Sequence, residues 1–167
     1  KDLNELGVSV TRKGKEFYFM FLPNKMTMIQ LDLPSYLTAG QKKINKDYFL
    51  SKINQDAVKS FDLGAQFEEA FQPDEINDMF FKTDHHWNMN GAAIGYKYVI
   101  DNIGKTTATT FDSEISADDY KMDCVDEKRL LGSWNKQLFG MIESSEEMIC
   151  YYTPQSYSFD DFEVYKG

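Results

Sequence analysis

The run from Glu16 to Leu22 constrains the fold more than any other stretch of this chain. Its residues are Glu-Phe-Tyr-Phe-Met-Phe-Leu, and from Phe17 onward they are aromatic or apolar on both of the faces that alternate along an extended strand. Such a strand needs cover on both sides, which is typical of a central strand with helices on each face of its sheet. Pro23 ends the run because proline cannot donate to the ladder. The sequence therefore predicts an α/β fold.

Lys25 follows this strand directly, in the turn Pro23-Asn24-Lys25. In α/β folds the carboxyl ends of the strands form the edge at which ligands bind. Lys25 is therefore a candidate for contacting or supporting a site at that edge. An ordinary surface turn residue is the alternative interpretation of the same position.

Apolar periodicity and turn residues predict the remaining elements. A helix is expected to end at Gly7, and an irregular loop is expected from Met26 to Gly40. Residues 105–128 are rich in Thr, Asp and Ser and are predicted to be a loop. The other predicted helices are 45–54, 64–71 and 90–103, the last with Asn90 as N-cap, Gly104 as stop and an apolar stripe of Ala93, Tyr96, Ile100 and Ile103. The other predicted strands are 56–62, 79–81, 148–152 and 162–165.

Composition excludes several classes of protein. The net charge of -9 argues against nucleic acid as a partner, since phosphate binding needs clustered Lys and Arg. Most acidic residues are expected to form solvated surface. No apolar run approaches the ~20 residues that cross a bilayer. Two cysteines, Cys124 and Cys150, are too few for a disulfide-built scaffold, and either a single bridge or two buried thiols fits them.

The stretch Thr83-Asp84-His85-His86-Trp87-Asn88 holds both histidines of the chain, between a predicted strand and a predicted helix. If the backbone is extended here, Asp84 and His86 share a face and His85 points away. A carboxylate beside an imidazole fixes its tautomer and stabilises the imidazolium, as a general base for a serine nucleophile requires. Trp87 is expected either to shield the imidazole from water or to pack under the following helix.

Two other interpretations of this stretch stay open. An Asp-x-His pair is commonly a local structural hydrogen bond without a catalytic role. Asp84, His85 and His86 also form a ligand set found in metal-dependent phosphoesterases. Those enzymes use further Asp-rich motifs that are not found here, and adjacent histidines on an extended segment diverge. No metal and no cofactor is therefore expected.

The block from Thr83 to Asn88, followed by Asn90-Gly91-Ala92, resembles the signature of the bacterial "DHHW" protein family. It is also similar to the Asp-x-His-Trp motif of the alginate O-acetylation proteins, which have SGNH-hydrolase-like domains. Upstream, Phe19-Met20-Phe21-Leu22-Pro23-Asn24-Lys25 resembles the strand ending in Pro-x-Lys that these proteins carry. The resemblance covers about residues 3–104 in order and spacing.

This resemblance implies a three-layer α/β/α, flavodoxin-like fold with a mostly parallel sheet and a Ser-His-Asp triad. By matching positions, Asp84 would be the orienting acid and His86 the base. Lys25, His85, Trp87 and Asn88 would bind substrate or support the site. The whole of 1–167 is expected to belong to one such domain or a fragment of one, with the motifs in 1–104 and a loop-rich part in 105–167.

One part of the pattern is missing. No Gly-Asp-Ser or equivalent strand-turn-serine follows His86. Ser133 lacks a preceding apolar strand, and Ser113 lies in a polar stretch. The nucleophilic serine is therefore expected beyond Gly167 or absent from the protein, and this chain alone is not expected to hydrolyse acyl esters. A truncated parallel sheet would also leave an apolar edge, and we expect either a second copy of the chain or the chain's own tail to cover it.

The resemblance leads to the main functional hypothesis, a cell-envelope domain outside the cytoplasm that moves or removes acyl groups, chiefly acetyl, on a polysaccharide. Its partners would be the polysaccharide and an acyl donor, for which a membrane acyltransferase is one source. The main alternative is a non-catalytic carbohydrate-binding or assembly protein of the same fold, in which Tyr and Trp side chains stack on sugar rings. The metal-dependent phosphoesterase is a lesser alternative.

Overall fold

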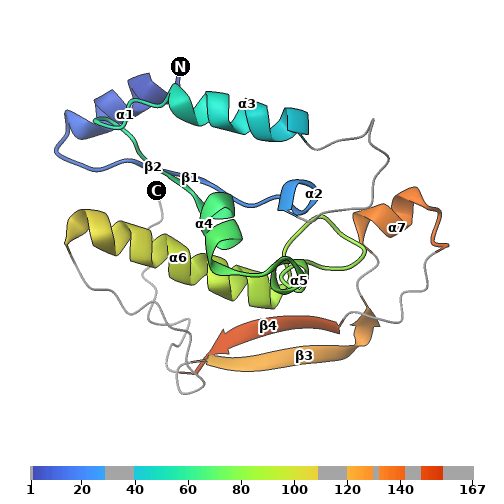
Figure 1. Cartoon of the computed structure of the whole chain (residues 1–167). Coiled ribbons are helices and arrows are strands. Elements are labelled where there is room, and N and C mark those ends of the chain that lie inside the picture. Colours follow the sequence, from blue (N-terminus) through green and yellow to red (C-terminus); the bar gives the residue numbers. More distant parts are fainter. Residues whose placement is uncertain (1, 29–39, 109–119, 130–131, 142–147, 156–167) are drawn as a thin grey trace, which may run out of the picture.

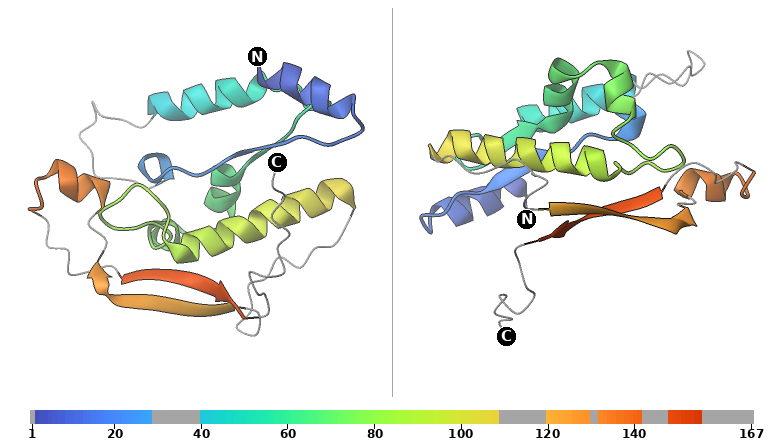
Figure 2. Two further views of the ribbon diagram at one scale, coloured as in Figure 1. Left: turned by 180° about the vertical axis from the view of Figure 1, so that it is seen from behind. Right: turned by 90° about the horizontal axis from the view of Figure 1, so that it is seen from below.

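The computed structural model describes residues 2–28, 40–108, 120–129, 132–141 and 148–155. Helices lie on both faces of a small sheet, with α1 (Leu3–Thr11) and α3 (Gly40–Ser51) on one side and α4 (Leu63–Ala70) and α6 (Met89–Thr107) on the other, and a long pair of antiparallel strands runs beside α6 (Figures 1 and 2). The helices are α1 (Leu3–Thr11), α2 (Lys25–Met28), α3 (Gly40–Ser51), α4 (Leu63–Ala70), α5 (Pro73–Asn77), α6 (Met89–Thr107) and α7 (Ser133–Gln137). The strands are β1 (Tyr18–Phe21), β2 (Lys59–Asp62), β3 (Tyr120–Arg129) and β4 (Met148–Pro154).

The sheet between the helices consists of β1 and β2, which run parallel, with Tyr18 opposite Lys59 and Phe21 opposite Asp62. Both strands are half-buried along their length. The predicted α/β architecture with a parallel sheet is confirmed. β1 is shorter than the apolar run that predicted it, because ladder pairing extends only over the residues that face β2.

Two clusters of buried side chains fill the space on either side of this sheet. One joins α4, α5 and α6, where the Phe67 ring lies 5.2 Å from that of Tyr98 in an edge-on arrangement. The other joins α1, α3 and the start of β2. The buried residues are Phe67, Ile76, Met79 and Phe80 in the first cluster and Ile53, Ala57 and Val58 in the second.

Most elements of the N-terminal half were predicted with bounds that differ by a few residues. Two were missed. α2 begins at Lys25, in the predicted turn, and runs into the predicted loop, because the Asn24 side chain caps it by accepting the Met26 N–H at 2.9 Å. Pro73 starts α5 because its fixed φ suits a first helical position. The strand predicted at 79–81 is reduced to one antiparallel bridge between Phe80 and Trp87. Residues 29–39 of the predicted loop lie outside the described residues.

Gly7 does not end a helix as predicted. It lies buried inside α1, where a Cβ atom would be 2.5 Å from Cγ2 of Val58 and 2.7 Å from the backbone oxygen of Ala57. Glycine is required there because the helix backbone lies directly against the start of β2. The helix continues to Thr11, whose hydroxyl donates to the Gly7 carbonyl.

The long helix α6 begins earlier and ends later than predicted. Asn88, not Asn90, is its N-cap: the Asn88 Oδ1 accepts the Gly91 N–H at 3.0 Å. Gly104 does not stop the helix, which continues to Thr107 and ends with Ala108 in the left-handed conformation. The helix therefore starts directly after Trp87.

The face that α6 turns to the core also differs from the predicted stripe. Tyr96 is exposed, whereas Ile94 and Tyr98 pack against the cluster around Phe67. Gly95 is buried, and a Cβ there would lie 2.3 Å from Cζ3 of Trp87. The apolar pattern of this helix does not show which face is buried. Glycine is not counted among the apolar residues of such a pattern, although it allows the closest packing.

The prediction of a loop over residues 105–128 is wrong at both ends, because α6 runs to Thr107 and β3 begins at Tyr120 and pairs antiparallel with β4. Residues 109–119 of this predicted loop lie outside the described residues. Tyr120 lies opposite Pro154 and Cys124 opposite Cys150, and the two cysteines form a disulfide. The strand residues are largely polar, so their pairing with β4 is not visible in the local sequence. The strand predicted at 162–165 lies outside the described residues.

We expect the disulfide to contribute about 3–4 kcal/mol to stability, because it closes a loop with a sequence separation of 26 in the unfolded chain. Replacing both cysteines by Ala is expected to lower the free energy of unfolding by that amount. Urea unfolding of the oxidised protein and of the double variant measures the difference. Adding reductant is expected to destabilise the first protein and to leave the variant unaffected. Equal stability of the two proteins would contradict the expectation.

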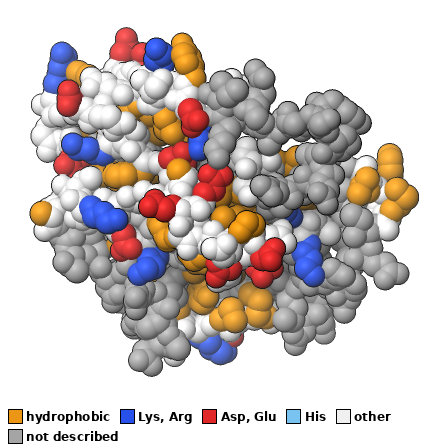
Figure 3. All heavy atoms as spheres, viewed as in Figure 1, with side chains coloured by type: hydrophobic (Ala, Val, Ile, Leu, Met, Phe, Trp, Pro, Cys, Tyr) orange, Lys and Arg blue, Asp and Glu red, His pale blue; other side chains and the backbone are white. Residues whose placement is uncertain are grey.

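The exposed acidic side chains agree with the net negative charge of the chain. The acidic residues of α4 and α5, such as Glu68, Glu69, Asp74 and Glu75, are exposed, and acidic side chains gather over this face in Figure 3. Within the described residues, no helix combines the length and the apolar character needed to cross a bilayer.

Candidate functional site

A tight loop between α5 and α6 carries Asp84, His85 and His86. Its two ends pair like a hairpin: the Phe81 N–H donates to the His86 carbonyl at 3.1 Å, and the Asn88 N–H donates to the Met79 carbonyl at 2.9 Å. The chain between them turns, so the predicted extended backbone is wrong. The turn brings all three side chains together at the tip of the loop, above buried residues.

Asp84 is the buried member of this group, with 8% of its surface exposed. Its Oδ1 accepts the backbone N–H of His86 at 2.9 Å and lies 2.5 Å from Nδ1 of the same residue. Its Oδ2 accepts the backbone N–H of Ser133 at 2.7 Å. Both carboxylate oxygens therefore bind donors, and the carboxylate is held from two sides.

The ring of His86 is held at one nitrogen while its side chain stays 66% exposed. An ionised carboxylate only accepts hydrogen bonds, so Nδ1 must carry the proton in the bond to Asp84. In the neutral ring, Nε2 is then the acceptor. The pair therefore offers a base at Nε2 whose protonated form Asp84 stabilises.

Burial tends to raise the pKa of Asp84, but hydrogen bonds from the backbone N–H groups of Ser133 and His86 and from the His86 ring outweigh it. The pKa of Asp84 is lowered well below its usual value. The carboxylate is therefore ionised wherever the protein is folded at ordinary pH.

Since the folded-state pKa of Asp84 is below its unfolded value, ionisation of Asp84 stabilises the fold above about pH 4. This contribution is expected to be lost progressively as the pH falls below about 4. The measurement is urea unfolding of the wild type and of Asp84→Asn between about pH 6 and pH 3. The stability difference between the two proteins should shrink toward the acid end, and a constant difference would contradict the assignment.

His85 was predicted to point away from Asp84, and this is wrong. Its ring centroid is 3.9 Å from that of His86, and its Nδ1 is 3.4 Å from Oδ1 of Asp84. The same Nδ1 is 3.0 Å from the hydroxyl oxygen of Ser133. The turn brings the two rings to one side, so the histidines do not diverge.

As a result, Asp84, His85 and His86 each bring one possible metal-ligand atom within 4.8 Å of the others. These atoms are already engaged in contacts within the protein, His85 with Ser133 and His86 with Asp84. The geometry therefore fits a hydrogen-bonded acid–base pair at least as well as it fits a metal site.

The segment Gly132-Ser133-Trp134, at the start of α7, was not predicted to belong to the site. The Gly132 N–H donates to Oγ1 of Thr83 at 3.2 Å, and the Trp134 N–H donates to the Thr83 carbonyl at 3.1 Å. With the bond from Ser133 to Asp84, three consecutive N–H groups bind the turn. Sequence reasoning considered Ser133 only as a nucleophile, because backbone donors leave no mark in a sequence.

Trp87 and Asn88 support the turn from below through packing and hydrogen bonds within the protein. The Trp87 ring packs edge-on to Phe67, with 6.4 Å between centroids, and lies on Gly95 of α6. Of its two predicted roles, packing under the helix is the one observed. Asn88 caps α6, and its Nδ2 donates to the Asp78 carbonyl at 2.7 Å.

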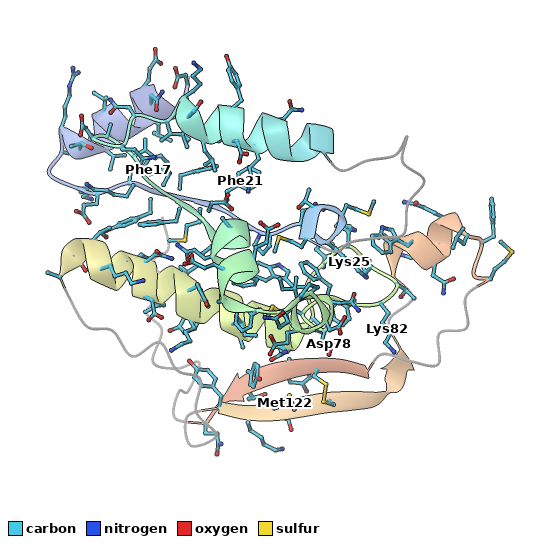
Figure 4. The ribbon with its side chains drawn as sticks, viewed as in Figure 1. Phe17, Phe21, Lys25, Asp78, Lys82 and Met122 are labelled. Carbon is cyan, nitrogen blue, oxygen red and sulfur yellow. A yellow bond between two sulfur atoms is a disulfide. The ribbon has the colours of Figure 1, made fainter. Side chains whose placement is uncertain are left out.

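Lys25 does not project into the open edge at which β1 and β2 end. A cavity of about 300 Å³ lies at that edge, lined by residues that include Phe21, Thr27, Lys46 and Asp62, but Lys25 is not among them. Only 5% of Lys25 is exposed, so the interpretation as a surface turn residue is wrong. Figure 4 shows Lys25 on α2, beside the loop that carries Lys82.

Comparison with known proteins agrees with this fold and with the motif. The family model described as SGNH hydrolase-like domain, acetyltransferase AlgX, matches residues 2–155. The solved structure of Bacillus cereus PatB1 is similar over 92% of this chain and 50% of its own, with 40% identity and a TM-score of 0.73. The structure of Bacillus cereus PatB1 with sulfonyl adduct is similar over 91% and 47%, with 37% identity and a TM-score of 0.68.

No match was found among curated proteins. The chain spans about half the length of the PatB1 chains that it matches. The resemblance to the alginate O-acetylation proteins is confirmed by the family match, and that to the "DHHW" family stays a prediction. Because the family model covers residues 2–155, nearly the whole chain, the chain belongs to the AlgX family of SGNH hydrolase-like acetyltransferase domains.

Proposed function

We propose that this domain transfers or removes acyl groups, chiefly acetyl, on a cell-envelope polysaccharide. Asp84 is the orienting acid and His86 the general base in this proposal. The observation that supports it most directly is the contact between Oδ1 of Asp84 and Nδ1 of His86, which leaves Nε2 of an exposed ring as a base. The family match supplies the acetyltransferase class.

The proposed reaction uses His86 twice. Nε2 first takes the proton of a serine hydroxyl as its oxygen attacks the acyl carbonyl, and then gives that proton to the departing group of the donor. In the second half, Nε2 deprotonates a sugar hydroxyl that attacks the acyl-serine, and the proton returns to the serine oxygen. Asp84 stays ionised throughout and stabilises the His86 imidazolium. With water in place of the sugar, the same steps give hydrolysis.

The serine in this scheme is proposed to come from residues outside the sequence described here. The similar PatB1 chains are about twice as long as the matched region, which leaves room for it. One of those chains carries a sulfonyl adduct. Sulfonyl reagents react with activated hydroxyl nucleophiles, so the adduct is consistent with a serine mechanism in that protein.

Ser133 is the serine nearest the pair, but its contacts suit a supporting role. Its hydroxyl pairs with Nδ1 of His85, whereas the proposed base is Nε2 of His86. Ser133→Ala keeps the backbone N–H that binds Asp84 and removes only the hydroxyl. We expect kcat to change by less than about 10-fold, whereas loss of a nucleophile lowers it by about 10⁶-fold. Steady-state acyl-transfer kinetics distinguish the two outcomes.

The proposed location is the cell envelope, outside the cytoplasm. The disulfide between Cys124 and Cys150 is consistent with it, since disulfides persist in oxidising compartments. The proposed partners are a polysaccharide and an acyl donor, delivered by a membrane acyltransferase.

The test uses the full-length protein, an acetyl-ester substrate and a polysaccharide acceptor, together with a sulfonyl reagent that labels active serines. We expect ester cleavage, transfer to the acceptor and labelling, all lost in His86→Ala. A protein that is folded but inactive would overturn the proposal and favour a binding protein of the same fold. Activity that persists in His86→Ala would overturn the role of His86 as the general base.

A further inference from the structure

Lys25 is a buried lysine whose side chain ends in a cluster of backbone oxygens. Its Nζ donates to the carbonyls of Phe81 at 2.5 Å, Lys82 at 3.0 Å and Asp84 at 3.3 Å. The same ammonium lies 4.4 Å from the centre of the Trp134 ring. These four contacts join Lys25 to residues that are more than 50 positions away in the sequence.

The three carbonyls belong to the turn that carries the proposed acid and base. The backbone oxygen of Asp84 accepts a hydrogen bond from the Lys25 ammonium, and the side-chain carboxylate of Asp84 contacts the His86 ring. Trp134, on the other side of the ammonium, belongs to the segment whose Ser133 N–H holds the second oxygen of Asp84. Lys25 thus contacts the backbone of Asp84 and also Trp134, the neighbour of the residue that holds the second oxygen of the carboxylate.

The chemistry of the side chain suits this place. Carbonyl oxygens that converge from three residues need a compact group with several donors, and an ammonium supplies three on a flexible stem. A guanidinium is a flat, rigid fork and fits such a cluster less well. An apolar side chain of the same length would remove this donor from the partly buried carbonyl of Lys82 and from the buried carbonyl of Asp84.

We propose that Lys25 is a positioning residue of the Asp84–His86 pair: its ammonium holds the 81–84 turn against Trp134 and thereby fixes the carboxylate to which His86 binds. Lys25 touches neither His86 nor a substrate in this proposal and acts through Asp84. The proposal rests on the proposed function for its kinetic consequence, but its structural consequence can be measured without any activity.

The kinetic experiment compares full-length wild type with Lys25→Met and Lys25→Arg. Lys25→Met keeps the length of the side chain and removes all donors, and we expect kcat to fall about 10–100-fold with KM unchanged, as for a misplaced catalytic group. Lys25→Arg is expected to recover part of the loss because it keeps the charge and some donors. All rates are divided by the folded fraction, measured by circular dichroism.

Lys46→Met is the matched control. Lys46 is also a largely buried lysine, and it pairs with Asp62 at 2.5 Å, away from the turn. Its replacement is expected to lower stability and to leave the proton of the His86 ring on Nδ1. A general effect of losing a buried ammonium would change the His86 tautomer in both variants and would overturn the proposal.

The second readout is the tautomer of the His86 ring, obtained from nitrogen chemical shifts in a ¹⁵N-labelled protein. The contact with Asp84 is expected to keep the proton on Nδ1 in the wild type and in Lys46→Met. In Lys25→Met the ring is expected to shift toward the Nε2-protonated form, with a partial return in Lys25→Arg. His86→Gln identifies the resonance.

The two proposals fail in different ways. If the wild type is active and His86→Ala is not, but Lys25→Met keeps the wild-type kcat and tautomer, Lys25 is only structural and the proposed function stands. If the wild type shows no acyl transfer, the proposed function fails. The tautomer then still decides the role of Lys25: a shift in Lys25→Met supports it, and an unchanged ring overturns it.

Discussion

Replacing Asp84 by Asn is expected to lower kcat by about 10³–10⁴-fold in the full-length protein, with little change in KM. The carboxylate accepts three hydrogen bonds, two at Oδ1 from His86 and one at Oδ2 from Ser133. An amide has only one accepting oxygen. Whichever way it is turned, its NH₂ group meets an N–H donor, of His86 or of Ser133. The His86 ring then loses the partner that keeps its proton on Nδ1.

The same change is expected to lower the free energy of unfolding at neutral pH by about 1–3 kcal/mol, since a buried donor is left unpaired. Asp101→Asn is the control, because Asp101 is an accessible carboxylate on α6, 4.0 Å from Lys97. It is expected to change neither kcat nor stability appreciably. Steady-state kinetics and urea unfolding of the two variants give both quantities. Activity of Asp84→Asn near the wild-type level would contradict the role of Asp84.

Replacing Gly132 by Ala is expected to separate α7 from the turn. The added Cβ would lie 2.0 Å from the Thr83 carbonyl oxygen and 2.7 Å from the Asp84 nitrogen. Both are backbone atoms, so no side-chain rotation relieves the contact. The φ angle of Gly132 is −61°, which suits any residue, so the close approach alone requires glycine.

Because the clash forces the segment away from the turn, Gly132→Ala is expected to break the hydrogen bonds from Gly132, Ser133 and Trp134 together. We expect a loss of about 2–4 kcal/mol in stability and a fall of kcat on the order of 100-fold. Ser133→Ala, one residue further, adds no atom near Thr83 and is the control. Unfolding curves and kinetics of both variants test this, and equal behaviour of the two would contradict it.

The sequence predicted the features that depend on short-range patterns. The apolar run around β1 and the proline after it indicated a covered strand in an α/β fold, which the parallel pairing with β2 confirms. The spacing of Asp84 and His86 indicated a possible contact, and they are in contact. The reason given for it, an extended backbone, was wrong, because a turn brings the two side chains together.

The sequence did not predict features that depend on backbone packing or on distant partners. Gly7 looked like a helix stop and is a close contact with Val58. Gly132 and Ser133 bind the turn through N–H groups that every residue has except proline. Lys25 looked like a lysine at an open edge, and only its three-dimensional neighbours show that it is buried beneath Asp84.

The disulfide between Cys124 and Cys150 has a consequence for the acid–base pair, because residues 132–134 lie within the loop that it closes. A tether at both ends of a segment raises the local concentration of that segment near its docking surface. Oxidation therefore favours the contact of Ser133 with Asp84 entropically, without touching either residue. A reduced chain would hold this carboxylate less firmly, so thiol oxidation would accompany formation of the acid–base pair.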